Sequence, residues 1–167
     1  MNQILASIVA GVCGDCAAAG VMKKKTVSEA ERGCLFCEIA AHRVSAKIIF
    51  EDEISLAFLD HRPLFPGHVL LIPTAHYATL TDLPAELVGP FFVNAQKLTA
   101  VVQATMKAQG SFVAMNNTVS QSVPHLHVHI VPRTKGDGLR GFFWPRLKPG
   151  EEELVAVHET LSGKRKE

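Results

Sequence analysis

The sequence predicts an α+β domain in which one long helix packs on an antiparallel sheet. Two observations support this prediction. Short apolar runs bounded by turn residues recur along the chain, and one longer stretch between them carries apolar residues at helical spacing. Strands followed by a helix and then by further strands are typical of this class. The length of 167 residues suits one domain and leaves no room for a second enzyme domain.

Three strands are expected before the long helix. The segment "AKIIFEDEISLAFLD" holds two apolar runs around the acidic turn Glu51-Asp52-Glu53, which predicts a hairpin over residues 46–60. The segment "RPLFPGHVLLIP" then supplies a Pro/Gly turn, and the apolar run after it predicts a third strand over residues 68–72.

The long helix is expected from Pro84 to Gln109. A proline suits the start of a helix, and Gly110 suits its end. Between them the apolar residues follow a helical spacing. They are Leu87, Phe91, Val93, Leu98, Val101, Val102 and Met106.

Two more strands and a short helix are expected after this point. Residues 111–116 predict the fourth strand, and a polar loop separates it from the fifth strand, which is predicted over residues 123–133 between Val123 and Arg133. A last helix over residues 151–161 is expected after the turn at Pro149-Gly150.

The fifth predicted strand, "VPHLHVHIVPR", carries three histidines at alternate positions. In an extended strand His125, His127 and His129 point to the same face, with neighbours roughly 6 to 7 Å apart and the outer pair roughly 13 Å apart. A single core histidine is usually a structural residue, but three in register favour a site. Metal–nitrogen bonds of about 2.0–2.1 Å let at most two adjacent rings share one ion. The row better suits a polyphosphate, because neutral imidazole attacks phosphorus and charged imidazole stabilises oxyanions.

The composition limits the cellular compartment and the binding partners that are expected for the protein. A net charge of +1 gives no electrostatic reason to expect binding to nucleic acid or to a membrane surface. The four cysteines form two C-x-x-C pairs, Cys13/Cys16 and Cys34/Cys37, which favours metal binding in a reducing compartment over a disulfide framework. We therefore expect a cytoplasmic protein that takes a small-molecule partner.

The chain is expected to have three parts. Residues 1–33 form an N-terminal extension, residues 34–146 the domain, and residues 147–167 a tail with a short helix. The first 22 residues lack the basic start of a secretory signal and the length of a membrane span. Two alternatives stay open for them: a flexible extension or unusual targeting segment, and a gene-start artefact with translation beginning at Met22.

Five motifs in order resemble the landmarks of the histidine triad (HIT) family. They are "CLFCEI", "AFLD", "GHVLLIPTAH", "MNN" and "QSVPHLHVHIVPR", and they span roughly residues 34 to 146. The resemblance implies a HIT-like fold, with a five-stranded antiparallel sheet, one long helix and short helices. It also implies a homodimer that forms a ten-stranded sheet with two nucleotide sites.

The resemblance assigns roles to residues of the site. His127 matches the nucleophile that attacks a nucleotide α-phosphorus, and His129 lies beside the transferred phosphate. Asp60 matches the ribose contact, although an aspartate at a strand end also suits a turn. Gln121 and Ser122 match hydrogen-bond donors to the phosphate, with a turn as the alternative. The remaining matches are the base-flanking residues Phe36, Ile39, Phe58 and His61, each of which could equally be core, and an asparagine that is either Asn116 or Asn117.

The resemblance also implies a structural zinc site. Some HIT proteins hold zinc with a cysteine pair and two histidines, which match Cys34, Cys37, His76 and His125. Four such ligands make a closed tetrahedral site. A four-cysteine zinc ribbon made by the two C-x-x-C pairs is the alternative.

The function that the resemblance implies is hydrolysis of dinucleoside polyphosphates or adenosine phosphoramidates through a covalent nucleotidyl-histidine, with no organic cofactor. A non-enzymatic nucleotide-binding partner protein and a nucleotidyltransferase are the alternatives. Beyond the triad, Arg140 and Arg146 flank the aromatic residues Phe142, Phe143 and Trp144. Either this segment packs on the dimer, or its arginines meet distal phosphates in the partner's site.

Overall fold

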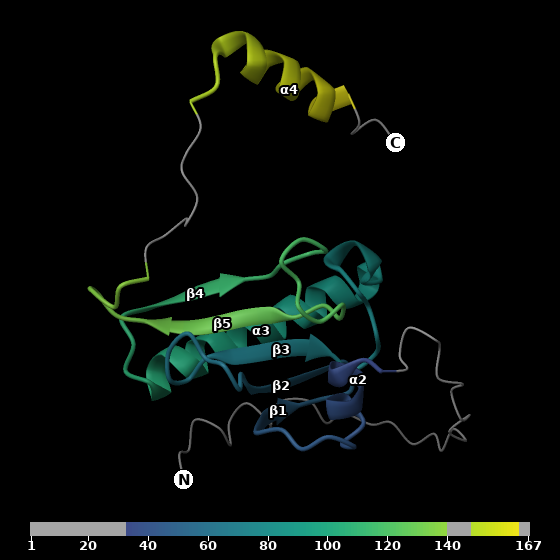
Figure 1. The fold of residues 1–167 in the computed structure, drawn as a ribbon, viewed down its shortest axis with the longest axis vertical. Helices are drawn as coiled ribbons and strands as arrows, with labels where there is room; N and C mark the ends of the chain where they lie inside the picture. Colours follow the sequence, from purple (N-terminus) through teal and green to yellow (C-terminus); the bar gives the residue numbers. More distant parts are fainter. Residues whose placement is uncertain (1–32, 140–147, 164–167) are drawn as a thin grey trace. The chain divides into compact units, whose positions relative to one another are not determined.

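The structure is a computed structural model that describes residues 33–139 and 148–163 (Figure 1). It divides into two compact units, one ending at Lys135 and the other beginning at Gly136. The first unit contains a five-stranded sheet of order β1-β2-β3-β5-β4, in which every neighbouring pair is antiparallel. The strands are β1 (Ile48–Glu51), β2 (Ser55–Leu59), β3 (Val69–Pro73), β4 (Gly110–Ala114) and β5 (Val128–Arg133).

The helices of the described residues are one long helix and three short ones. The long helix α3 (Ala85–Thr105) contacts β3, β4 and β5. The short elements are α2 (Leu35–Ala40), the 3-10 helix η1 (Leu80–Asp82) and α4 (Glu151–Gly163). The predicted fold class, a five-stranded antiparallel sheet with one long helix and short helices, is therefore confirmed.

Each face of the sheet is covered by a different helix, because strand side chains alternate between the faces. On one face, Val69, Leu71, Val128 and Ile130 pack with buried residues of α3. On the other face, alternate residues of β2 and β3 pack with Cys34, Phe36 and Ile39 of the α2 segment. These strand residues are Leu56, Phe58, Leu70 and Ile72. His129 is paired with Leu70 across the strands, so it belongs to the face of α2.

The turn between β1 and β2 is connected to α3 through a partly buried hydrogen bond. One carboxylate oxygen of Asp52 accepts hydrogen bonds from the backbone N–H groups of Ile54 and Ser55, at 3.0 and 2.8 Å. The other oxygen accepts a hydrogen bond of 2.6 Å from the side-chain amide of Asn94, which lies on α3. The predicted acidic turn is present, but Glu51 belongs to β1 and the turn begins at Asp52.

The two largest differences between predicted and observed element boundaries have local reasons, and the third and fourth strands, Val69–Pro73 and Gly110–Ala114, differ from the predicted bounds by one or two residues. The long helix begins after Pro84 as expected, but it ends at Thr105 because Lys107 adopts a positive φ of 53°. The fifth strand begins at Val128 and not at residue 123. The expectation that all three histidines lie in one extended strand is therefore wrong, since only His129 does. The last predicted helix is confirmed and extends to Gly163.

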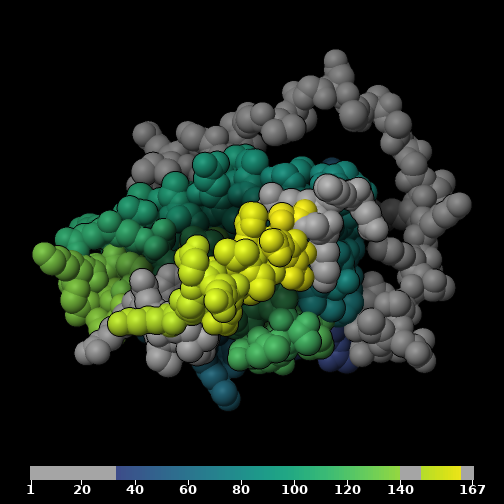
Figure 2. All heavy atoms as spheres, turned by 90° about the horizontal axis from the view of Figure 1, so that it is seen from above, coloured from purple at the N-terminus to yellow at the C-terminus, as the bar shows by residue number. Residues whose placement is uncertain are grey.

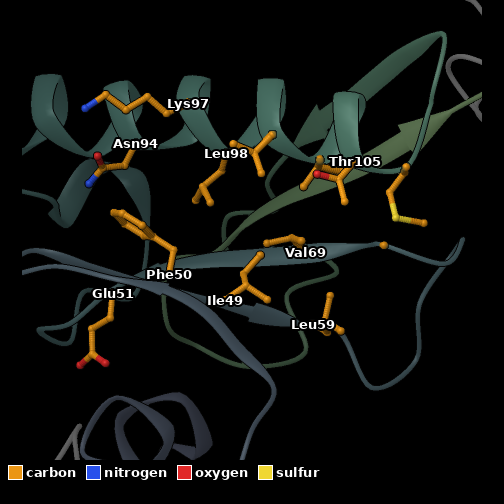
Figure 3. A pocket seen from close by; sticks show the side chains of 13 residues that line it. Ile49, Phe50, Glu51, Leu59, Val69, Asn94, Lys97, Leu98 and Thr105 are labelled. Carbon is orange, nitrogen blue, oxygen red and sulfur yellow. The ribbon is translucent and has the colours of Figure 1, made fainter. Parts of the chain in front are cut away.

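An apolar groove of about 590 Å³ lies between α3 and the strands on the face that packs against this helix (Figure 3). Ile49 of β1, Val69 of β3 and Leu98 of α3 point toward one another in it. The triad histidine His129 faces the opposite side of the sheet. The groove is therefore separate from the histidines.

Figure 2 shows α3 (teal) at the surface of the first unit. Val93 of this helix is exposed. In the second unit, Leu154, Val157 and Leu161 of α4 are also exposed. Among the helices of the described ranges, none has the length and apolar character needed to cross a membrane. The predicted N-terminal extension with Cys13 and Cys16 lies outside the described residues, and so does the segment 140–147 with its arginines and aromatic residues.

Candidate functional site

His127 is held in one orientation by a backbone hydrogen bond. Its Nδ1 lies 2.6 Å from the carbonyl oxygen of His125, and the ring is only 3% exposed. A carbonyl oxygen only accepts, so Nδ1 must carry the proton and donate. In the neutral ring the lone pair is then on Nε2. This is the arrangement that a nucleophilic imidazole requires.

His129 is held by a second histidine, His68. Nε2 of His68 lies 3.0 Å from Nδ1 of His129. The backbone N–H of Leu64 donates to Nδ1 of His68 at 3.2 Å, so in neutral His68 the proton is on Nε2, which donates to His129. In neutral His129 the remaining proton is then on Nε2. Burial lowers the pKa of both rings, that of His129 to about 4 with a further contribution from the neighbouring His127 and His68.

Asp60 lies between two histidines at the end of β2. Its carboxylate oxygens are 3.4 Å from Nδ1 of His68 and 3.6 Å from Nδ1 of His61. The backbone N–H of Arg62 donates to one of these oxygens at 2.8 Å. The side chain of Asp60 is 13% exposed, whereas that of His61 is 79% exposed. The turn role and a ligand contact are therefore compatible, because one oxygen serves the turn and the other faces His68.

The four predicted zinc ligands lie together. Nδ1 of His125 is 3.5 Å from Sγ of Cys34 and from Sγ of Cys37, and Nδ1 of His76 is 3.2 Å from Sγ of Cys37. All four ligand atoms lie within 4.8 Å of one another. Zinc bonds of roughly 2.3 Å to sulfur and 2.0–2.1 Å to nitrogen at tetrahedral angles give a sulfur–nitrogen separation of about 3.5 Å. The observed spacing fits this value.

The orientation of His125 also suits a metal ligand. Its Nε2 lies 2.9 Å from the carbonyl oxygen of Pro73, so Nε2 donates and Nδ1 keeps its lone pair toward the cysteines. Burial is the main cause that lowers the pKa of His125 to about 4, which keeps the imidazole neutral. A second group of possible ligands, Asp60, His68 and His129, is also close together. In this second group, the hydrogen bond between the rings of His68 and His129 accounts for the short distance between them.

The predicted phosphate-binding loop is ordered by its own polar side chains. Gln121 donates from Nε2 to the carbonyl oxygen of Ala78 at 2.6 Å, and its Oε1 accepts from the N–H of Thr118 at 2.8 Å. Asn116 donates to the carbonyl oxygen of Ser120 at 3.2 Å. Asn117 accepts from the N–H of Leu80 at 2.7 Å, so each asparagine holds part of the loop. Ser122 is exposed.

The residues predicted to flank the base separate into two groups. Phe36, Ile39 and Phe58 are 6%, 5% and 4% exposed and pack together, with the rings of Phe36 and Phe58 at 5.5 Å. Their core role is therefore observed, and only their edges can border a ligand. His61 is exposed beside Asp60.

Sequence reasoning missed His68 as a site residue. The sequence predicts this residue only as the start of the third strand. The pairing of Leu70 with His129 puts His68, two residues away on the same face, diagonal to His129. The strand register therefore determines this contact. The signal in the sequence was a histidine at the start of an otherwise apolar strand.

The chain is similar to a known family and to several proteins of other organisms. A family model of the HIT domain matches residues 41–136. An uncharacterized HIT-like protein of Methanocaldococcus jannaschii is 36% identical over 77% of this chain and 95% of its own length. An adenosine 5'-monophosphoramidase of Saccharomyces cerevisiae is 32% identical over 80% of this chain and 84% of its own. A bis(5'-nucleosyl)-tetraphosphatase (asymmetrical) of Schizosaccharomyces pombe is 31% identical over 70% of this chain and 66% of its own.

Solved structures agree with this assignment. A HIT family protein of Bacillus subtilis is 30% identical, with a TM-score of 0.72 over 80% of this chain and 96% of its own. A zinc-bound histidine triad family protein of Mycobacterium smegmatis is 35% identical, with a TM-score of 0.62 over 81% of this chain and 99% of its own. The fold, the order of the motifs and these similarities lead to one conclusion: the chain belongs to the HIT family.

Proposed function

We propose that this protein hydrolyses nucleoside 5'-phosphate derivatives through a covalent nucleotidyl-histidine on His127. The hydrogen bond from Nδ1 of His127 to the carbonyl oxygen of His125 carries this proposal, because it fixes the ring and leaves the lone pair on Nε2. The family membership and two relatives named as nucleotide hydrolases support the reaction class.

The proposed reaction has two steps. In the first, Nε2 of His127 attacks the α-phosphorus, the phosphorus–nitrogen bond forms, and the bond from phosphorus to the leaving group breaks. A polyphosphate leaves as an anion, whereas an amine leaving group takes a proton from solvent. In the second, water attacks phosphorus, the electron pair of the phosphorus–nitrogen bond returns to Nε2, and the proton of the water passes to solvent. Covalent catalysis of this kind replaces one difficult displacement by two easier ones.

Neighbouring groups stabilise the charges that develop in these steps. The carbonyl oxygen of His125 stabilises the positive ring of the adduct through Nδ1. The Nε2–H that we infer for His129 donates to phosphate oxygens. Asp60 accepts hydrogen bonds from the ribose hydroxyls, and Ser122 donates to the phosphate. Gln121 contributes by ordering the loop, since its side chain is already engaged there.

Two substrate classes follow from the named relatives, namely dinucleoside polyphosphates and adenosine phosphoramidates. The experiment compares turnover of diadenosine tetraphosphate with that of adenosine phosphoramidate by wild-type protein and by His127→Ala. Release of AMP from at least one substrate by the wild type, and from neither by the variant, is expected. Nucleotide binding without release of AMP by the wild type would instead favour the non-enzymatic partner protein.

We also propose that Cys34, Cys37, His76 and His125 hold a structural zinc ion. The distances among their ligand atoms support it, as does the zinc-bound relative. Zinc with four protein ligands has no open position, so it adds folding stability and takes no part in the bond-breaking steps. The measurement is zinc per chain in purified protein.

We further propose a homodimer built on the edge strand β4. Among the described strands this one pairs with β5 and ends the sheet, and its residue Val113 is 45% exposed. The edge strand of a sheet suits pairing with a second copy. Val113→Lys is expected to shift the protein toward monomer in sedimentation experiments, whereas Val93→Lys on the outward face of α3 serves as the control. Unchanged dimer in Val113→Lys would contradict this interface.

A further inference from the structure

The four-residue segment from Cys34 to Cys37 contributes to the metal cluster and to the support of the nucleophile. The two cysteines at its ends belong to the cluster with His76 and His125. Phe36, which lies between them, is buried at 6% exposure. Its ring centroid is 5.3 Å from that of His127 at an interplanar angle of 83°, so an edge of one ring meets the face of the other.

A second connection runs through His125. Its side chain points to the cysteines, and its own backbone carbonyl oxygen accepts the hydrogen bond from His127. The ring of Phe36 also lies 6.0 Å from that of His125. His127 is thus held on one side by the backbone carbonyl oxygen of His125, a proposed zinc ligand. On another side it meets the ring of Phe36, which lies in the sequence between the proposed ligands Cys34 and Cys37.

We propose that the metal cluster is a positioning device for the nucleophile, in which bound zinc holds Phe36 and the carbonyl group of His125 against the ring of His127. Phe36 is then a positioning residue and more than a wall of the base pocket. This inference rests on the proposed function of His127. It goes beyond a structural role for zinc because it makes the orientation of a reacting group depend on metal occupancy.

The small size of the α2 segment explains why metal would matter here. The helix has six residues and no side-chain hydrogen bond at its N-cap, Cys34. A helix of this length is not stable alone, so its place depends on contacts with the rest of the domain. The cluster and the apolar packing of Phe36 and Ile39 supply those contacts. A displacement of about 1 Å at a reacting group can cost roughly 100-fold in rate.

The experiment compares two neighbouring substitutions in the full-length, zinc-loaded protein. Phe36→Leu keeps an apolar core residue but removes the ring beside His127. Leu35→Ala, at a position in the same helix that is 44% exposed, is the matched control. Zinc per chain, KM, and the single-turnover rate of nucleotidyl transfer to His127 are measured with adenine and with pyrimidine substrates.

The expected result separates positioning from base binding. Phe36→Leu is expected to keep zinc and to slow transfer at least about tenfold with both bases, since orientation acts on the chemical step. KM is expected to change less than about threefold. Leu35→Ala is expected to match wild type. A change confined to KM and base preference, with an unchanged single-turnover rate, would overturn the assignment of Phe36.

A second readout needs no substrate. In nitrogen-15 labelled wild type, the Nδ1–H signal of His127 is recorded with zinc and after its removal by a chelator. Loss or a marked shift of this signal, with the sheet retained by circular dichroism, is expected. An unchanged signal would overturn the dependence of His127 on zinc. If the proposed function itself is wrong, the wild type forms no covalent adduct with the substrate, whatever the spectra show. The two failures can therefore be distinguished.

Discussion

Nε2 of His68 donates a hydrogen bond to Nδ1 of His129 across 3.0 Å, and this contact links the start of β3 to the triad. The N–H of Leu64 determines which nitrogen of His68 carries the proton. Backbone groups therefore determine which ring nitrogen carries the proton in both triad histidines. The N–H of Leu64 does so for His129 through His68, and the carbonyl group of His125 does so for His127.

Replacing His68 is expected to impair catalysis through His129. In His68→Ala the donor to Nδ1 is lost, so the Nε2–H that we propose donates to the phosphate is no longer enforced, and kcat is expected to fall about 10- to 100-fold. His42→Ala is the control, because the exposed imidazole of that residue pairs with Glu51 at 3.0 Å. Steady-state kinetics decide the matter. A kcat equal to wild type in His68→Ala would contradict the role of this contact.

Stability is expected to fall as the pH falls from about 6.5 toward 4. Burial lowers the pKa of His68 and lowers that of His129 to about 4, so in this window the unfolded chain binds protons that the folded chain does not. The stability that the two histidines contribute while they are neutral is present in full above pH 6.5 and is lost as the pH approaches 4. Urea denaturation of His129→Asn, which cannot titrate there, is expected to show a smaller pH slope than wild type. Equal pH slopes in the variant and in wild type would show that His129 does not contribute to the pH dependence of stability.

The loop before the triad contains two residues with a left-handed backbone. Thr118 has a φ of 65° and Ser120 a φ of 61°, a region that a β-branched residue rarely adopts. Thr118→Gly is expected to raise the free energy of unfolding by about 0.5–1 kcal/mol, since relief of this strain outweighs the added chain entropy. Ser111→Gly in β4 is the control and is expected to be destabilising. A loss of stability in Thr118→Gly would show that the loop is unstrained.

Loss of a zinc ligand is expected to lower both zinc content and melting temperature. Cys34→Ser, Cys37→Ala, His76→Ala and His125→Ala should all share this result, because metal affinity is in part folding free energy. The double variant Cys13→Ser/Cys16→Ser is the control and is expected to keep its zinc. Metal analysis would favour the four-cysteine ribbon if the double variant lost the ion while His76→Ala retained it.

Much of the fold could be predicted because its signals are local. The hairpin, the third strand, the start of the long helix and the last helix follow from apolar spacing and turn residues. The end of the long helix could not be predicted, since it depends on the positive φ of Lys107. The start of the fifth strand at Val128 could not be predicted either. The alternation of histidine and apolar residues continues upstream into residues that are not in the strand.

The site could be predicted where a family motif names the residue and could not where the tertiary structure decides. Cys34, Cys37, His76 and His125 were named from motifs, and the structure brings them together. His68 was missed because its contact depends on the register between β3 and β5. For Phe36, the sequence could not distinguish a core position from a base contact, and the ring proves to be buried against His127.

Trapping of the covalent intermediate tests the proposed role of His127 most directly. Wild-type protein is mixed with a substrate labelled at the α-phosphorus, quenched rapidly without acid, digested and analysed by mass spectrometry, beside His127→Ala and His129→Ala. A nucleotidyl group is expected on His127 in wild type, none in His127→Ala, and slower formation of the same adduct in His129→Ala. Substrate turnover by His127→Ala at the wild-type rate, or an adduct on another residue of the wild type, would contradict this role.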